Sequence, residues 1–145
     1  MNLKYNQGNP ILMFSVLELR SQIALWEQYF QDSNSELQNL QGELTWFQVN
    51  NNTREASIQV EHFQNQLLLQ QQLITDMSRQ LKISERLLMR KDPKSVLEEN
   101  YLSCIKVLGE QMETFQKLYS DLKEEFKNVI VRANMINDQK QPQYI

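Results

Sequence analysis

The sequence has little of what catalytic and metal sites require. Its 145 residues include one cysteine and one histidine. A single cysteine excludes a disulfide within the chain, and His62 with Cys104 cannot supply the usual nitrogen and sulfur ligands of a zinc site. A catalytic triad or dyad would have to pass through His62. We therefore expect no catalytic residue, no metal and no cofactor, and we interpret the protein as non-enzymatic.

Glycine and proline are also scarce, with three of each in the sequence. An all-β fold needs more tight turns than this supply allows. Long hydrophobic runs are missing as well, because the apolar run 11–17 is too short to span a bilayer and charged residues follow it. It has no small-residue cleavage signal. The composition therefore predicts an all-α protein without membrane insertion.

A basic surface is the third absence. The formal net charge is -3 and the pI is near 5.2, whereas nucleic-acid-binding proteins usually carry a basic face. The chain has no polybasic patch for an anionic membrane either. Glutamine is abundant instead, at roughly one residue in eight, and it forms helices well without adding charge. We expect no direct nucleic-acid binding and solvated, glutamine-rich helix faces.

Apolar residues are present in three consecutive segments, where they recur in steps of three and four. This spacing keeps side chains on one line of a helix and is typical of coiled coils. We call each such line a seam. The first seam is Val16, Leu19, Ile23, Trp26, Phe30, Ser33, Leu37, Leu40, Leu44 and Phe47. The second is Val60, Phe63, Leu67, Gln70, Ile74, Met77, Leu81, Ser84 and Leu88.

The third segment has the widest apolar stripe. Its predicted seam is Leu97, Tyr101, Cys104, Leu108, Gln111, Phe115, Leu118, Leu122, Glu125, Val129, Arg132 and Ile136. A flanking line recurs at every seventh residue: Ile105, Met112, Tyr119, Phe126 and Ala133. One partner helix cannot cover both lines. The third helix is therefore predicted to contact at least two others.

Turn signals separate the segments at residues 50–53 and at Asp92-Pro93, and Asn52 with Glu55 resembles a capping box. The predicted organisation is a disordered N-terminus 1–8, a three-helix coiled-coil region 9–138 and a C-terminal tail 139–145. The helices are expected at about 10–49, 53–91 and 93–138. Short links make neighbouring helices antiparallel. The predicted fold class is all-α, three long helices in an antiparallel coiled-coil bundle, and the alternative is an extended coiled-coil oligomer.

A short apolar run near the N-terminus is the candidate partner-binding surface, formed by Ile11, Leu12, Met13 and Phe14. Four consecutive apolar residues surround a helix on all sides, and only some of them can face a core within the chain. Docking of another chain would cover the rest. The competing interpretation is a helix end buried by the loop near Asp92.

Because no reactive cluster is present, the sequence predicts a coiled-coil scaffold or assembly subunit. It would act by protein–protein binding through helix–helix contacts, as a homo- or hetero-oligomer. We expect a cytoplasmic, cytoskeleton-associated protein of cytoskeletal, centrosomal or ciliary structures. The alternative is a nuclear regulatory adaptor, an accessory subunit of a chromosome-associated complex. A basic stripe in the assembled complex would favour that alternative.

Overall fold

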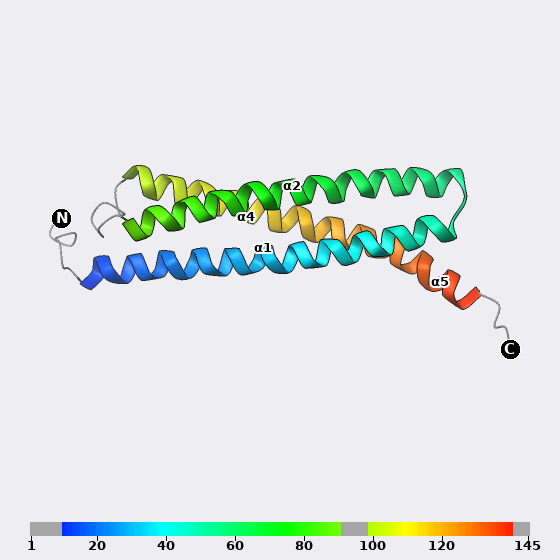
Figure 1. Cartoon of the computed structure of the whole chain (residues 1–145), viewed down its shortest axis with the longest axis horizontal. Coiled ribbons are helices and arrows are strands. Elements are labelled where there is room, and N and C mark those ends of the chain that lie inside the picture. Colours follow the sequence, from blue (N-terminus) through cyan, green and yellow to red (C-terminus); the bar gives the residue numbers. More distant parts are fainter. Residues whose placement is uncertain (1–9, 91–98, 141–145) are drawn as a thin grey trace. The chain divides into compact units, whose positions relative to one another are not determined.

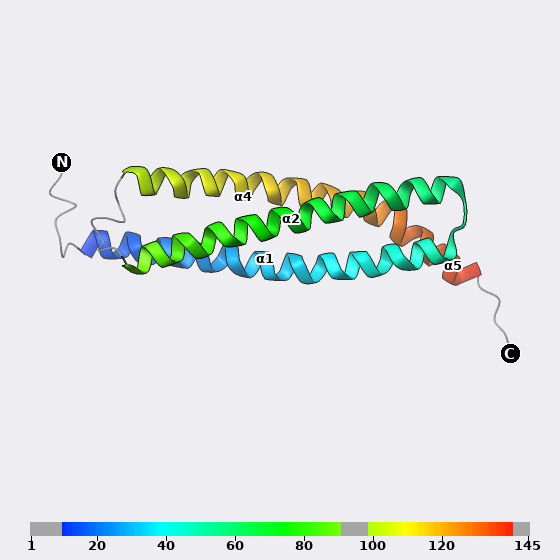
Figure 2. The same ribbon diagram turned by 45° about the horizontal axis from the view of Figure 1, so that its top comes forward.

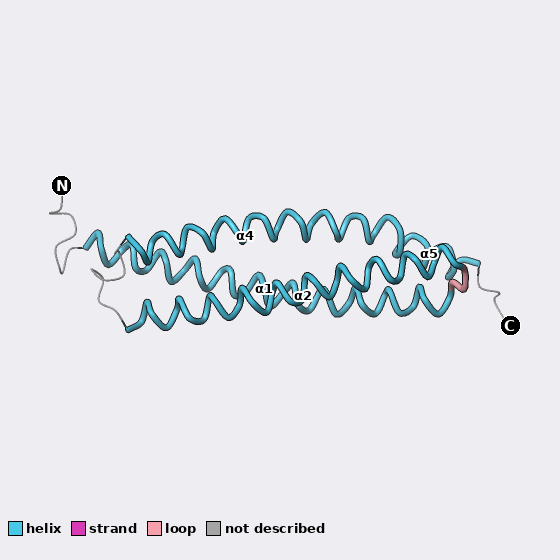
Figure 3. Tube along the Cα trace, turned by 90° about the horizontal axis from the view of Figure 1, so that it is seen from above, coloured by secondary structure: helices cyan, strands magenta, loops and turns pink. Residues whose placement is uncertain are grey.

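The computed structural model describes the backbone of residues 10–90 and 99–140, and the side chains within 17–89 and 105–137. The helices are α1 (Pro10–Asn50), α2 (Arg54–Arg90), α4 (Glu99–Phe126), the π-helix η2 (Lys127–Val131) and α5 (Arg132–Lys140). Every described residue outside 51–53 is helical (Figure 3). The predicted N-terminus 1–8, the Asp92-Pro93 boundary and most of the tail 139–145 lie outside the described residues.

The link between α1 and α2 is short because side chains satisfy the helix ends on both sides of it. Asn50 Nδ2 donates to the Trp46 carbonyl at 2.8 Å, and Asn51 Nδ2 donates to the Phe47 carbonyl at 2.9 Å. These bonds fold the two amide side chains back onto the last turns of α1. At the start of α2, the Ala56 N–H donates to Thr53 Oγ1 at 3.1 Å. The cap is thus Thr53, and not Asn52 as the sequence pattern indicated.

The chain forms two compact units. Unit 1 comprises Met1–Asp32 and Ile74–Thr114, and unit 2 comprises Ser33–Leu73 and Phe115–Ile145. Within each unit, α1 and α2 run in opposite directions and the third helical segment runs parallel to α1 (Figures 1 and 2). The predicted fold class, an all-α antiparallel three-helix bundle, is confirmed.

Unit 1 has an apolar core to which all three helices contribute. Its buried hydrophobic residues are Ile23, Phe30, Ile74, Met77, Leu81, Leu88, Leu108 and Met112. Trp26 of α1 is half-buried and lies against Gly109 of α4. A Cβ at position 109 would meet the indole at 3.6 Å, so glycine allows this close approach but is not strictly required for it.

Unit 2 has a core rich in aromatic side chains. Phe63 of α2 and Phe126 of α4 pack edge to face, with ring centroids 5.1 Å apart. The rings of Phe115 and Tyr119 stack at 5.6 Å. Such pairs add about 0.5–1.5 kcal/mol beyond the area they bury. The third helix contacts α2 through Phe126 and α1 through Tyr119, which confirms that it packs against two partners.

The seams predicted for the first two helices are confirmed wherever side chains are described. Their members in α1 from Leu19 onward and in α2 are buried or half-buried. This includes the polar members Ser33 and Gln70, which are 3% and 4% exposed. The expected solvated face of α2 is confirmed in part, because Gln71 and Gln72 are exposed while Gln70 lies in the core.

The seam predicted for the third helix is partly wrong. Leu108, Phe115 and Leu122 are buried, but Gln111 and Leu118 are exposed. Their places in the core are taken by Met112 and Tyr119 of the flanking line, and Phe126 of the same line is buried in place of the exposed Glu125. The true seam therefore steps by four and then three from Leu108, and it buries more apolar surface than the predicted line would have done.

Beyond Phe126 the prediction is wrong because the helix changes type. In η2 the Arg132 N–H donates to the Lys127 carbonyl, five residues back. A π turn holds one residue more than an α turn, so the core continues in steps of four to Ile130 and Asn134. The predicted positions Glu125, Arg132 and Ile136 are exposed, and Val129 is half-buried.

Candidate partner-binding surface

The predicted surface Ile11, Leu12, Met13 and Phe14 belongs to the first turns of α1. The side chains of these four residues lie outside the described part of the structure. The helix is present as predicted, but neither the docking surface nor the competing buried helix end is tested. This candidate site therefore stays a prediction.

Reactive chemistry is sparse among the described side chains. No group of three or more His, Cys, Asp or Glu residues could hold a metal ion there. His62 Nε2 lies 3.2 Å from Glu125 Oε1, and both side chains are substantially exposed. This pair joins the exposed faces of α2 and α4. The hydrogen bond between His62 and Glu125 includes no Ser, Thr or Cys side chain that could act as a nucleophile. The Cys104 side chain lies outside the described set.

One carboxylate of α1 in unit 2 is directed at α4. The Tyr119 hydroxyl donates to Glu36 Oε1 at 2.7 Å, and Lys123 Nζ lies 3.1 Å from the same oxygen. The Lys123 ammonium also lies 4.7 Å from the centroid of the Tyr119 ring. A hydrogen bond and an ion pair to the Glu36 carboxylate, with a cation–π contact between Lys123 and the Tyr119 ring, hold these three side chains together. The Glu36 carboxylate therefore faces α4 within unit 2.

The second carboxylate of α1 in unit 2 is directed at α5. Asn134 Nδ2 donates to the Glu43 backbone carbonyl and to Glu43 Oε2, both at 3.0 Å. Asn134 itself is 4% exposed. Glu36 and Glu43 are the only charged residues of α1 between Ser33 and Asn50. Both charges thus face the third helical segment, and neither faces α2.

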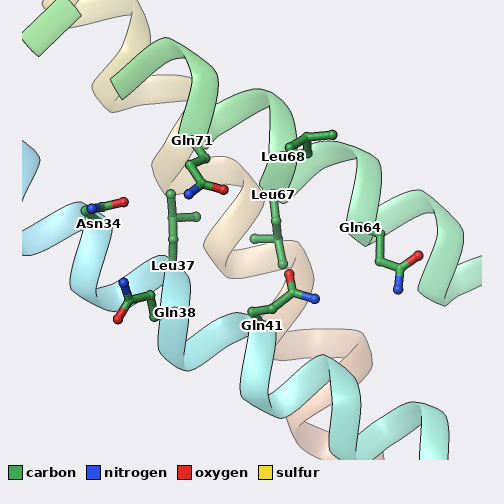
Figure 4. A pocket seen from close by; sticks show the side chains of 8 residues that line it. All are labelled: Asn34, Leu37, Gln38, Gln41, Gln64, Leu67, Leu68 and Gln71. Carbon is green, nitrogen blue, oxygen red and sulfur yellow. The ribbon is translucent and has the colours of Figure 1, made fainter. Parts of the chain in front are cut away.

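A groove without charged residues lies between α1 and α2 in unit 2. Its volume is about 400 Å³. The lining residues come in equal numbers from the two helices: Asn34, Leu37, Gln38, Gln41, Gln64, Leu67, Leu68 and Gln71. Figure 4 shows Leu37 and Leu67 pointing toward each other across the groove. Amides and leucines are thus the chemistry that this surface offers to a partner.

The groove has a regular pattern. Asn34, Gln38 and Gln41 are spaced by four and three on α1, and Gln64, Leu68 and Gln71 repeat the same spacing on α2. This spacing places each set on one face of its helix. Leu37 and Leu67 are buried at the floor, whereas Leu68 is 54% exposed and points away from α1 (Figure 4). The groove therefore presents an exposed leucine among amide side chains.

The sequence interpretation missed this groove. The sequence pattern assigned Leu67, Gln70 and Ile74 to the second seam and predicted solvated, glutamine-rich helix faces in general, without a groove between two helices. A usable signal was present, because α1 and α2 both carry uncharged residues at matching four-and-three spacing beside their seams. It becomes a shared groove only when the antiparallel pairing of the two helices is known.

Comparison with known proteins gives no assignment, since no protein-family model, curated protein or solved structure matches this chain.

Proposed function

We propose that this protein is a non-enzymatic scaffold or assembly subunit that binds other proteins through helix–helix contacts. The observation that carries the proposal is the uncharged groove between α1 and α2, lined by amides and leucines. Amphipathic helices with apolar anchors at three-and-four spacing dock into apolar grooves of other proteins, and Leu37, Leu67 and Leu68 supply the apolar part of this groove. We further propose that the partner is an uncharged helix with leucine and amide side chains.

The absence of charge in the groove favours a helix over other partners. Nucleic acid is held mainly by Lys and Arg contacts to phosphates, and the groove has no such residue. Burying a charge without a partner costs much more than burying an amide that finds a hydrogen bond. A partner with an uncharged face therefore loses least on docking. Among the described residues, no helix is long and apolar enough to cross a bilayer.

A cytoplasmic location with a cytoskeletal, centrosomal or ciliary assembly remains our working proposal for this class of protein. A basic stripe in the assembled complex would favour the nuclear adaptor alternative. The residues that line the groove include no Lys or Arg that could belong to such a stripe. We therefore place the proposed contact on the groove and pursue the scaffold function.

The groove can be tested by Leu68→Lys, which introduces an ammonium beside its leucine floor. Leu118→Lys is the matched control, because Leu118 is a similarly exposed leucine of unit 2 that lies outside the groove. The tagged 145-residue chain would be cross-linked in its native cells, and the recovered partners quantified. We expect Leu68→Lys to reduce the amount of partner protein cross-linked to the groove at least tenfold. Leu118→Lys should leave that amount within twofold of the wild-type value.

Equal recovery with both variants would contradict the groove as the binding surface. Circular dichroism and thermal melting establish first that both variants retain the helical fold. The N-terminal run is examined in the same assay with Ile11→Asp plus Phe14→Asp. Loss of partners in that variant alone would move the proposed contact from the groove to the N-terminal run.

A further inference from the structure

A second hollow in unit 2 lies where α1 meets η2 and α5. It has a volume of about 500 Å³ and is lined by Gly42, Glu43, Trp46, Val131, Asn134 and Met135. We call it the Trp46 cup. None of its residues lines the amide groove, so conclusions about the cup are independent of the proposed function above.

The hydrogen bonds of Asn134 determine what this residue can offer a ligand. The side-chain nitrogen of Asn134, Nδ2, donates two hydrogen bonds, one to the Glu43 backbone carbonyl and one to Glu43 Oε2. An amide turned the other way would place its oxygen against two acceptors, so the orientation is fixed by the network. The opposite atom, Oδ1, is buried and has no hydrogen-bond partner among the described residues. Asn134 thus has an acceptor left over and its donors engaged.

The π-helix is the reason that Asn134 is found here. Regular α-helical spacing would have brought Ala133 to this position, as the flanking line predicted, and alanine cannot bond Glu43. The extra residue of η2 shifts the inward position to Asn134. Single π turns are frequent at functional sites. In this chain the π turn places the Asn134 amide next to the Glu43 carboxylate of α1 at the edge of the hollow.

Three other side chains at the cup are electron-rich, whereas Gly42 and Val131 contribute only neutral surface. Glu43 is exposed and contributes a carboxylate. Trp46 is 40% exposed and Met135 is 57% exposed, which gives an indole and a thioether. Apart from the indole N–H, these side-chain groups accept hydrogen bonds or attract cations. No Lys or Arg lines the cup. The complementary ligand is a flat cation that carries several hydrogen-bond donors.

We propose that the Trp46 cup binds the guanidinium group of an arginine side chain on a partner protein. Guanidinium is planar, has five N–H donors and no acceptor, and stacks on aromatic faces. Glu43 binds its charge and the Trp46 ring stacks on its plane, beside the Asn134 amide that donates to Glu43. Lysine satisfies the carboxylate but lacks the flat surface that stacks on indole.

The proposal is tested by NMR titration of the whole 145-residue chain with N-acetyl-arginine amide. We expect shifts at the Trp46 indole N–H and the Asn134 side-chain amide, with a dissociation constant on the order of millimolar, as is usual for so small a group. N-acetyl-citrulline amide has nearly the same shape without the charge, and it should bind at least tenfold more weakly. Equal binding of the citrulline compound would overturn the proposal.

Two further measurements separate the alternatives. Glu43→Gln should weaken binding of N-acetyl-arginine amide at least fivefold, whereas Glu124→Gln removes an exposed carboxylate elsewhere in unit 2 and should change it less than twofold. Equal effects would mean that only overall charge attracts the probe, which overturns a built site. Free L-arginine should bind no more tightly than the capped compound. Tighter binding of the free amino acid would overturn the assignment to a protein-borne arginine.

Discussion

At the scale of single residues, Glu27 in unit 1 is a carboxyl of the described part of the chain whose pKa folding raises. Its Oε1 atom is buried and has no hydrogen-bond partner among the described residues. Burial raises the pKa of this carboxyl above its ordinary value of 4.5. A hydrogen bond with Glu85 and electrostatic repulsion from the same residue raise the pKa further. Lys82 lowers the pKa in part. Folding therefore favours the protonated form of Glu27.

The raised pKa gives a prediction about stability and pH. A carboxyl with a raised pKa in the folded state contributes its full stability below the unfolded pKa, and this contribution is lost as the pH rises through the folded value. Glu27→Gln mimics the protonated form at every pH. We expect this variant to melt at a higher temperature than the wild type at pH 7, with a gap that closes as the pH falls toward 4.5.

Glu110→Gln is the matched control for this prediction. Glu110 is an exposed carboxylate of unit 1, and exposed substitutions usually change stability by no more than about 0.5 kcal/mol. Thermal melts of both variants at several pH values provide the comparison. Parallel pH profiles for Glu27→Gln and Glu110→Gln would show that burial of Glu27 does not control its protonation.

At the scale of helices, the sequence was sufficient where a helix is regular. In α1 and α2 the seam repeats by three and four without interruption, so counting from any buried residue finds the others. Even Ser33 and Gln70 follow the count and are buried. Position on the helix therefore decides burial in these elements more strongly than the chemistry of one side chain does.

The third helix was harder to predict for two physical reasons. Two apolar lines run side by side along it, and the choice between Leu118 and Tyr119 depends on the neighbouring helices that fill the space. The π turn at η2 then changes which residues of the helix face the core. No single residue in Lys127–Val131 predicts a π turn from the sequence. The amide groove and the Trp46 cup were likewise not predictable, because each requires residues from two helices whose pairing must be known.

The π turn yields a prediction for this element. Deleting Asn128, an exposed residue of η2, removes the extra residue and places Ile130 and Asn134 three and seven positions after Phe126. That is regular seam spacing, so the shortened helix can become α-helical with the same core. We expect this deletion to change the urea midpoint much less than a deletion in a regular α-helical turn, because Ile130 and Asn134 keep their places in the core.

Deletion of Ser120 is the control for this experiment. Ser120 is exposed in the regular part of α4, and its removal turns every later residue by about 100° with no π turn to compensate. Tyr119 and Leu122 could then not both face the core, and we expect a cost above about 3 kcal/mol. Urea unfolding measures both deletions. A similar loss in each would mean that η2 itself is required for the fold.

At the scale of the whole molecule, both units are built from the same helices. α1, α2 and α4 each contribute residues to unit 1 and to unit 2. A helix half that loses its packing is marginally stable in water, because helix stability in proteins comes mainly from tertiary contacts. Unfolding of one unit therefore frays helices that the other unit uses. We expect the two units to unfold together in one cooperative transition.

The two tryptophans make this expectation measurable, because Trp26 belongs to unit 1 and Trp46 to unit 2. The single-tryptophan variants Trp26→Phe and Trp46→Phe each report on one unit by fluorescence. Leu108→Ala, which truncates a leucine of unit 1 that is 4% exposed, should cost about 2–5 kcal/mol. We expect it to lower both urea midpoints equally. If the midpoint reported by Trp46 stayed in place, the shared helices would not couple the units, and each unit would be stabilised by its own core alone.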